Sequence, residues 1–116
     1  MHPDMNDDTT STFISAVVMA EPALAPVLDD HLAANDVLLP HVFMGDVTRW
    51  LSARGPQPRV LDILDDAIAS ESRYVQDLIY FSFLENLDPR DVADERIVAA
   101  LSPRLRTALA VVRGDR

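Results

Sequence analysis

Eight prolines divide this chain of 116 residues into short segments, most of which repeat apolar side chains at the spacing of a helix. Proline lacks the backbone N–H that a helix interior needs, but it fits the first turn, where that N–H has no partner. Pro22 is therefore expected to end one helix, and Pro26, Pro40 and Pro103 each to lie near the start of another. Together with apolar residues three and four positions apart, the prolines predict helices over residues 10–20, 25–34, 41–53, 59–70, 72–87 and 90–101, and a last helix from residue 103.

The same pattern predicts the fold class. No stretch alternates apolar and polar residues as a half-buried strand would, and the chain has only three glycines. We expect an all-α fold, a compact irregular bundle of five to seven short helices. Residues 72–87 carry apolar side chains around most of the helix, Tyr74 and Phe81 among them, so this helix is expected to be central. Residues 1–9 lack apolar periodicity and are expected to form a disordered tail, with residues 10–116 as a single helical domain.

Several classes of protein are excluded by what the chain lacks. It has no cysteine, so disulfides, thiolate catalysis and cysteine-ligated metals are not open to it. No apolar run approaches the roughly 18 residues that cross a membrane. The N-terminus is acidic, unlike the basic and then apolar start of a secretory signal, so a cytoplasmic location is expected. All ten basic residues are arginine, which with many alanines and aspartates is typical of GC-rich bacterial genomes.

The net charge of −9 is unevenly distributed along the chain. Residues 1–89 contain 15 acidic residues and 4 arginines, whereas residues 90–116 contain 4 acidic residues and 6 arginines. An acidic surface repels phosphate, so neither nucleic acid nor a membrane is an expected partner, even with Arg104, Arg106 and Arg113 in the last helix. Basic proteins would be attracted instead. The alternative is that the charge only keeps a small protein soluble.

Two clusters of aspartates are the candidate partner-binding residues. Asp62, Asp65 and Asp66 are three and four positions apart and share one helix face, opposite the apolar stripe. Asp29 and Asp30 form a smaller cluster. Close carboxylates can act as an acid–base pair when they are buried, but a face opposite the apolar stripe is solvated. A merely solvated face is one interpretation, and a patch that attracts a basic protein is the other.

Two further acidic residues stand beside apolar residues and so need partners. They are Asp46 and Glu85, and His41 is available to them. We expect His41, Asp46 and Glu85 to form a structural polar network that fixes the helix register; an active site built from the same three residues is the alternative. Gly45 is expected to mark a close approach of two helices, because glycine within a helix costs about 1 kcal/mol relative to alanine.

Neither a cofactor nor a metal is expected. His31 and His41 lack the paired spacing of a zinc-binding helix, and His2 falls in the expected tail. Isolated histidines of this kind are more often surface or capping residues. The sequence also has no phosphate-binding glycine loop, serine elbow, dinucleotide fingerprint or calcium-binding loop.

Two runs of residues carry a family resemblance. They are Leu-Leu-Pro-His-Val-Phe-Met-Gly-Asp-Val-Thr-Arg-Trp-Leu at residues 38–51 and Ile-Tyr-Phe-Ser-Phe-Leu-Glu-Asn-Leu at residues 79–87. They resemble an uncharacterised family of small acidic helical bacterial proteins, in which a Leu-Pro-His…Asp helix precedes a Ser-Phe-x-Glu-x-Leu helix. Such proteins look like the immunity proteins of polymorphic toxin systems. The resemblance covers about residues 11–87, and it implies no catalytic residues.

Two hypotheses for the function follow. The first is an immunity-type protein without enzymatic activity, which binds a cognate toxin and covers its basic substrate cleft with the two aspartate clusters. Tyr80 is then the expected exposed aromatic anchor, with burial in the core as the alternative. The second is a helical adaptor or regulatory subunit without a toxin partner, homodimeric through exposed parts of the helix over residues 72–87.

Overall fold

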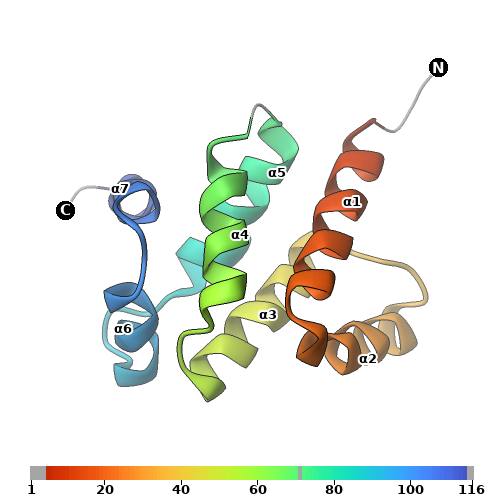
Figure 1. Cartoon of the computed structure of the whole chain (residues 1–116), viewed down its shortest axis with the longest axis horizontal. Helices are drawn as coiled ribbons and strands as arrows, with labels where there is room; N and C mark the ends of the chain where they lie inside the picture. Colours follow the sequence, from red (N-terminus) through yellow and green to blue (C-terminus); the bar gives the residue numbers. More distant parts are fainter. Residues whose placement is uncertain (1–4, 71, 115–116) are drawn as a thin grey trace.

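Seven α-helices make up most of the described part of the chain, which comprises residues 5–70 and 72–114 of a computed structural model (Figure 1). They are α1 (Met5–Ala20), α2 (Ala25–Asn35), α3 (Pro40–Arg54), α4 (Pro58–Ile68), α5 (Arg73–Asp77), α6 (Val92–Ala99) and α7 (Pro103–Val112). A 3₁₀ turn (Pro22–Leu24) joins α1 to α2, and α5 runs directly into a π-helix (Leu78–Phe83) and a 3₁₀ turn (Leu84–Asn86). These residues include no β-strand, so the prediction of an all-α bundle is confirmed.

Five of the described prolines, Pro22, Pro26, Pro40, Pro58 and Pro103, lie at the first or second residue of a helix or 3₁₀ turn. Pro40 and Pro103 are the first residues of α3 and α7, as predicted, and Pro58 is the first residue of α4. Ser102 precedes α7, and its Oγ accepts the backbone N–H of Leu105 at 3.1 Å. That hydrogen bond satisfies one of the N–H groups that a helix start leaves without a partner.

The first helix begins earlier than the apolar pattern predicts. α1 starts at Met5, so residues 5–9 of the expected tail are helical, while residues 1–4, including His2, lie outside the described residues. The physical reason is cooperativity. Once buried side chains such as Phe13 and Val17 fix one part of a helix, each further residue adds a hydrogen bond even without an apolar face.

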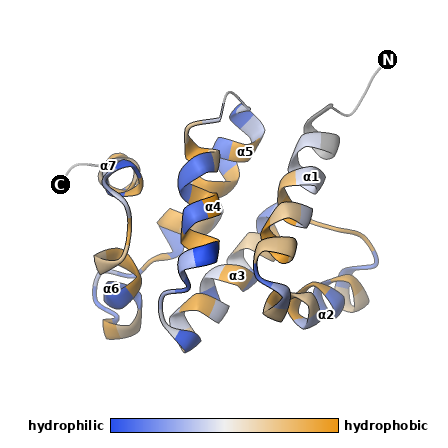
Figure 2. Ribbon diagram, viewed as in Figure 1, coloured by the Kyte–Doolittle hydropathy of each residue, from blue (hydrophilic) through white to orange (hydrophobic). Residues whose placement is uncertain are grey.

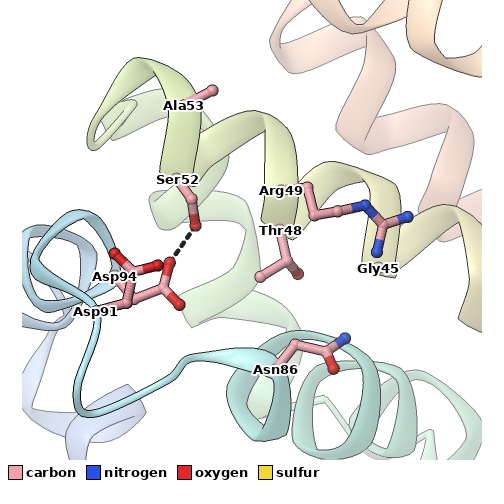
Figure 3. Close-up of a pocket in the computed structure, with 8 residues that line it drawn as sticks. All are labelled: Gly45, Thr48, Arg49, Ser52, Ala53, Asn86, Asp91 and Asp94. Carbon is pink, nitrogen blue, oxygen red and sulfur yellow. Dashed lines mark hydrogen bonds between the residues drawn. The ribbon is translucent and has the colours of Figure 1, made fainter.

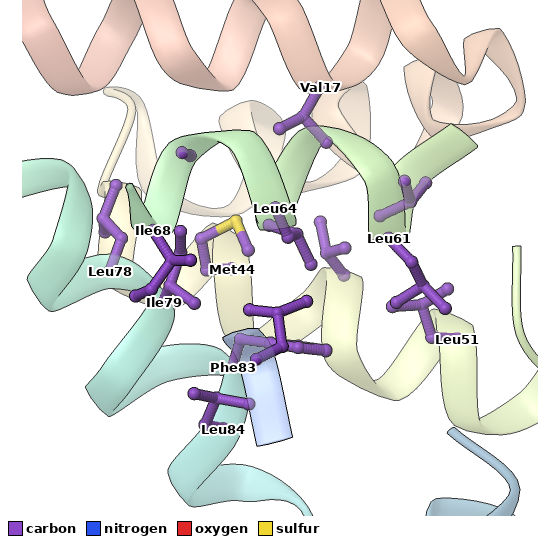
Figure 4. Close-up of a cluster of buried hydrophobic side chains, with 14 of the residues drawn as sticks. Val17, Met44, Leu51, Leu61, Leu64, Ile68, Leu78, Ile79, Phe83 and Leu84 are labelled. Carbon is purple, nitrogen blue, oxygen red and sulfur yellow. The ribbon is translucent and has the colours of Figure 1, made fainter. Parts of the chain in front are cut away.

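A single cluster of buried apolar side chains holds the helices together (Figure 4). Leu51 of α3, Leu64 of α4 and Ile79 and Phe83 of the π-helix have no solvent exposure. Burying a side chain of this size stabilises the fold by about 1.5–3 kcal/mol. The π-helix packs on α3 and α7, and α5 packs on α1 and α4. Residues 73–86 therefore have the central position that the sequence predicts.

Two aromatic side chains of this central segment face outward, contrary to expectation. The middle of the segment is the π-helix, whose turn is wider than that of an α-helix because its hydrogen bonds join residues five apart. Phe81 is 55% exposed, and Tyr74, in the first turn of α5, is 50% exposed, although the apolar pattern placed both in the core. Tyr80 is half-buried against the core. The more exposed of the two adjacent aromatics is thus Phe81 and not Tyr80, the expected anchor.

The described helices are short and pack closely. Their radius of gyration is 13.7 Å, near the value of about 13 Å for a compact domain of this length. No single helix among them has both the length and the hydropathy to cross a membrane. The segments Thr9–Ala20 and Pro22–Asn35 meet that standard only as a pair, and they are bent by 115° relative to each other.

Gly45 is buried within α3, yet its surroundings leave room for a side chain. A Cβ atom there would lie 3.7 Å from the ends of the Arg49 and Asn86 side chains, which is an ordinary van der Waals separation. The expectation of a close helix–helix approach at Gly45 is therefore wrong. Gly55 is different, because it ends α3 with φ at 93°, a conformation that side chains with a Cβ disfavour.

Substitution of the two glycines by alanine should have opposite effects. Gly45→Ala is expected to raise the free energy of unfolding by about 0.5–1 kcal/mol, because alanine restricts the unfolded chain and meets no clash in the helix. Gly55→Ala should lower it by about 1 kcal/mol, because the positive φ becomes strained. Urea denaturation measures both, and a destabilised Gly45→Ala would show that α3 does need the glycine.

Candidate functional site

Exposed carboxylates cluster on α2 and α4. Asp29 and Asp30 on α2, and Asp62 and Asp66 on α4, are exposed, and none of the four has an ion pair within residues 5–70 and 72–114. α1 lies between α2 and α4 in Figure 1, so the two clusters occupy separate parts of the surface. Unpaired carboxylates attract positive charge over roughly a Debye length, about 8 Å at physiological salt.

Asp65 holds two helices together and does not present a free carboxylate. Its Oδ1 accepts a hydrogen bond from Ser102 Oγ at 2.6 Å, and Arg104 Nε lies 3.8 Å from the same oxygen. The Arg104 guanidinium also donates to the backbone carbonyl of Asp65 at 3.3 Å. Asp65 thus links α4 to the start of α7. Of the three aspartates expected to face a partner from α4, only Asp62 and Asp66 remain available.

Exposed apolar side chains concentrate where α2 leads into α3. Four of the nine large apolar residues that are exposed in the described part of the chain belong to this region: Leu32, Val37, Leu39 and Val42. Figure 2 shows the connection changing from hydrophilic to hydrophobic along its length. Apolar side chains gathered beside carboxylates are typical of a protein-binding surface. The candidate site, here named the α2–α3 surface, comprises Asp29, Asp30, Leu32, Val37, Leu39 and Val42.

A buried histidine fixes the path of this connection. His31 on α2 is 3% exposed, and its Nε2 accepts the backbone N–H of Leu39 at 3.0 Å. A neutral imidazole that accepts at one nitrogen carries its proton on the other, so Nδ1–H faces Asp46 Oδ2 at 3.6 Å. The Asn35 amide group, 3.3 Å from Nδ1, donates instead to the His31 carbonyl at 2.8 Å. The ring also packs edge-on against Phe43 at 5.7 Å between centroids, so His31 belongs to the interior and departs from the general tendency of isolated histidines to lie at the surface.

The three residues expected to form one polar network lie in three different surroundings. Asp46 pairs with Arg49, one turn later in α3. His41 Nδ1 lies 2.6 Å from the hydroxyl of Ser82, and this contact joins α3 to the π-helix. Glu85 is exposed and has no ion pair among the described residues. The network is therefore not formed as expected, because Glu85 lies on the outer face of the central segment. Nor does the geometry bring the three side chains together as one reactive site.

A cavity of about 420 Å³ opens between α2 and α3 beside the α2–α3 surface. Asp30, His31, Val42, Asp46 and Arg49 are among the residues of its wall. The volume falls within the range of roughly 300–1,000 Å³ that small-molecule sites occupy. Asp30 and Val42 of the α2–α3 surface line the cavity, so the surface adjoins a hollow large enough to receive a side chain.

A second cavity of about 420 Å³ lies between α3, the 3₁₀ turn at Leu84–Asn86 and the start of α6 (Figure 3). Figure 3 shows Ser52 and Asp94 facing each other there. Asp94 is 6% exposed; one carboxylate oxygen accepts from the Ser52 hydroxyl, and the other accepts the backbone N–H of Asp88 at 2.8 Å. Because both oxygens already accept hydrogen bonds, this carboxylate links α3 to the chain before α6.

The turn that Asp94 holds contains a carboxyl group with a shifted pKa. The backbone N–H of Arg90 donates to Asp88 Oδ1 at 2.9 Å, and this hydrogen bond is the main cause of a lowered pKa of the Asp88 carboxyl. The charge of the Arg90 guanidinium adds to the effect. Asp88 is exposed, so the shift describes the local turn and not a buried reactive group.

Neither a metal site nor a similarity to a known protein indicates a function. The described residues include no group of three or more histidine, aspartate and glutamate side chains that could hold a metal ion. No family model, no curated protein and no solved structure matches the chain.

The sequence pattern identifies the acidic part of this surface but not its apolar part. Val37 and Leu39 belong to an apolar run beside a proline, which is equally typical of a buried connection. A signal was nevertheless present. Asn35-Asp36 favours a turn, and Asp36 does adopt a positive φ of 68°, which directs the following apolar residues out of the helix.

Proposed function

We propose that this protein is an immunity-type inhibitor, which binds a cognate toxin domain with a basic surface and neutralises it by covering its substrate cleft. The observation that carries the proposal is the α2–α3 surface, where the unpaired carboxylates of Asp29 and Asp30 accompany exposed apolar side chains. Charge of this kind speeds the encounter with a partner, and an apolar centre slows dissociation. The family resemblance supports the same surface, because one of its two runs contains Leu39 and Val42.

The charge of the protein also limits the kind of partner. An enzyme that acts on an anionic substrate needs a basic cleft, and a protein of net charge −9 is attracted to that cleft for the same reason as the substrate. Nucleic acid and anionic membranes would be repelled. In this proposal the protein acts in the bacterial cytoplasm, holds no cofactor and catalyses no reaction.

Neutralisation of a toxin is the direct test. The gene next to the one that encodes this chain, expressed alone, should stop growth, and expression together with this chain should restore growth. The two purified proteins should also form a complex. An adjacent gene without toxic activity, or growth arrest that this chain does not relieve, would count against the proposal.

Two sets of substitutions should separate the effects of charge and apolar contact. Asp29→Asn combined with Asp30→Asn is expected to lower the association rate constant about tenfold at low salt, with little change in dissociation. Val37→Asp should raise the dissociation rate constant at least about 30-fold, because it brings a carboxylate into a desolvated contact. Surface plasmon resonance at two ionic strengths measures both constants.

Matched controls place the same changes elsewhere on the molecule. Asp62→Asn combined with Asp66→Asn removes the same charge from α4, and Met19→Asp adds a carboxylate at an 80% exposed position of α1. These variants should bind the toxin domain much as the parent does. If the α4 pair weakens binding more than the α2 pair, the partner contacts α4 and the assignment to the α2–α3 surface is wrong.

A further inference from the structure

The outer face of the central segment and the end of α7 form an apolar groove at a distance from the α2–α3 surface. α7 and α2 lie at opposite ends of the molecule (Figure 1). The groove has a volume of about 400 Å³, and its apolar lining comes from Tyr80, Phe81, Val111 and Val112. Val111 is 61% exposed, and Phe81 is exposed as well. The face therefore has an apolar projection beside an apolar hollow.

An aromatic ring projects from this face, because Phe81 lies two residues from each of the buried Ile79 and Phe83 and therefore on the opposite side of the π-helix. Leu78, Ile79 and Phe83 of the same six residues are buried, whereas Phe81 is turned outward. An exposed phenylalanine gives up the stabilisation that burial would provide. Short π-helical turns also occur frequently at functional sites. Both facts point to a contact that covers Phe81.

Charged side chains stand at the two ends of the groove. Arg73 lies at the N-terminal end of the central segment, Asp77 one turn later, and Glu85 at the C-terminal end. None of these three has an ion pair within the residues that the structure describes. The groove lining thus has a guanidinium at one end, a carboxylate at the other end and a second carboxylate between them.

We propose that this groove binds a second copy of the chain, with the two central segments packed antiparallel across a two-fold axis. In this arrangement Phe81 of each copy enters the groove of the other, and Arg73 of each copy faces Glu85 of the other. A two-fold interface uses the same patch on both copies, so the patch must be complementary to itself. An apolar projection beside a hollow, with opposite charges at the two ends, meets that requirement.

A basic partner fits this groove less well than a second copy does. Arg73 would repel a segment that is basic throughout, although Asp77 and Glu85 would attract it, whereas antiparallel copies bring each Arg73 close to a carboxylate of the other copy. The net charge of −9 on each copy still opposes association at long range. The expected dissociation constant is therefore on the order of micromolar. The dimer does not depend on the proposed inhibitor function, since toxin binding is assigned to a different surface.

Sedimentation equilibrium of the full chain, from about 1 to 500 μM, tests the dimer and its geometry together. The parent protein is expected to dimerise, and Phe81→Asp to raise the dissociation constant at least about 100-fold. Arg73→Glu and Glu85→Arg should each raise it about tenfold, because each places like charges opposite each other. The double variant should return to within about threefold of the parent, since both pairs are then restored with reversed signs.

Two controls keep the result interpretable. Val92→Asp puts a carboxylate on an exposed apolar residue of α6 and should leave the dimer unchanged. If Phe81→Asp loses its helical circular dichroism, Val111→Asp takes its place in the test, because Val111 lines the groove from α7. A monomer at every concentration, a dimer that neither Phe81→Asp nor Val111→Asp weakens, or a charge exchange that fails to restore affinity would each overturn the proposal.

Discussion

Replacement of Asp94 by alanine is expected to lower the free energy of unfolding by about 3 kcal/mol. The buried carboxylate accepts the Ser52 hydroxyl and the backbone N–H of Asp88, and alanine would leave both donors without a partner. Asp94 also lies in the first turn of α6, where a negative charge interacts favourably with the helix dipole. Urea denaturation followed by circular dichroism measures the change.

Asp94→Asn provides the comparison that isolates the hydrogen bonds from the charge. The asparagine Oδ1 can still accept from the fixed N–H of Asp88, and the Ser52 hydroxyl can rotate to accept from the amide nitrogen. The expected loss is therefore only about 1 kcal/mol. Equal losses for Asp94→Asn and Asp94→Ala would mean that the negative charge, and not the pair of hydrogen bonds, stabilises the junction between α3 and α6.

His31→Ala should have an effect of similar size, a loss of about 2–4 kcal/mol in the free energy of unfolding. It removes the acceptor for the backbone N–H of Leu39 and the ring that packs on Phe43. It also widens the cavity between α2 and α3. Because the Leu39 N–H then has no acceptor within the fold, its hydrogen exchange should accelerate as well, which NMR measures residue by residue.

His31→Gln and His41→Ala are the controls for this substitution. Glutamine can still offer an oxygen to Leu39, so it should recover part of the lost stability. His41 is exposed, and its contact with the Ser82 hydroxyl is expected to be worth only about 1 kcal/mol. If His31→Ala costs less than His41→Ala, the connection from α2 to α3 does not depend on the buried ring.

The helices and their order could be predicted because the signals are local. Proline fixes where a helix begins or ends, and apolar residues three and four apart mark the face that will be buried. Pro40 and Pro103 are the clearest examples, and the apolar run at residues 72–87 indicated the central segment. The exposure of Asp62 and Asp66 could also be predicted, since both lie opposite an apolar stripe.

The remaining features depend on contacts between residues far apart in sequence. Asp65 has the same helical spacing as its neighbours, but its role is decided by Ser102, 37 residues later. His31 is buried because the connection folds back to place Leu39 against its ring. Phe81 lies two positions from each of the buried Ile79 and Phe83, so helical spacing places it on the opposite side of the helix. What the sequence does not tell is which side of a segment that is apolar all round the other helices leave uncovered.

In the proposed dimer, the π-helix provides a way to change the contact surface without altering the interior of the fold. A π-helical turn is equivalent to one extra residue inserted into a continuous α-helix. Deletion of one residue there would restore α-helical geometry and rotate the Phe81 side chain about the helix axis by about 100°. Ile79 and Phe83 are held by their own neighbours on α3 and need not move. Proteins with this fold that differ by a single residue at that point should therefore share the same hydrophobic core and yet bind different partners.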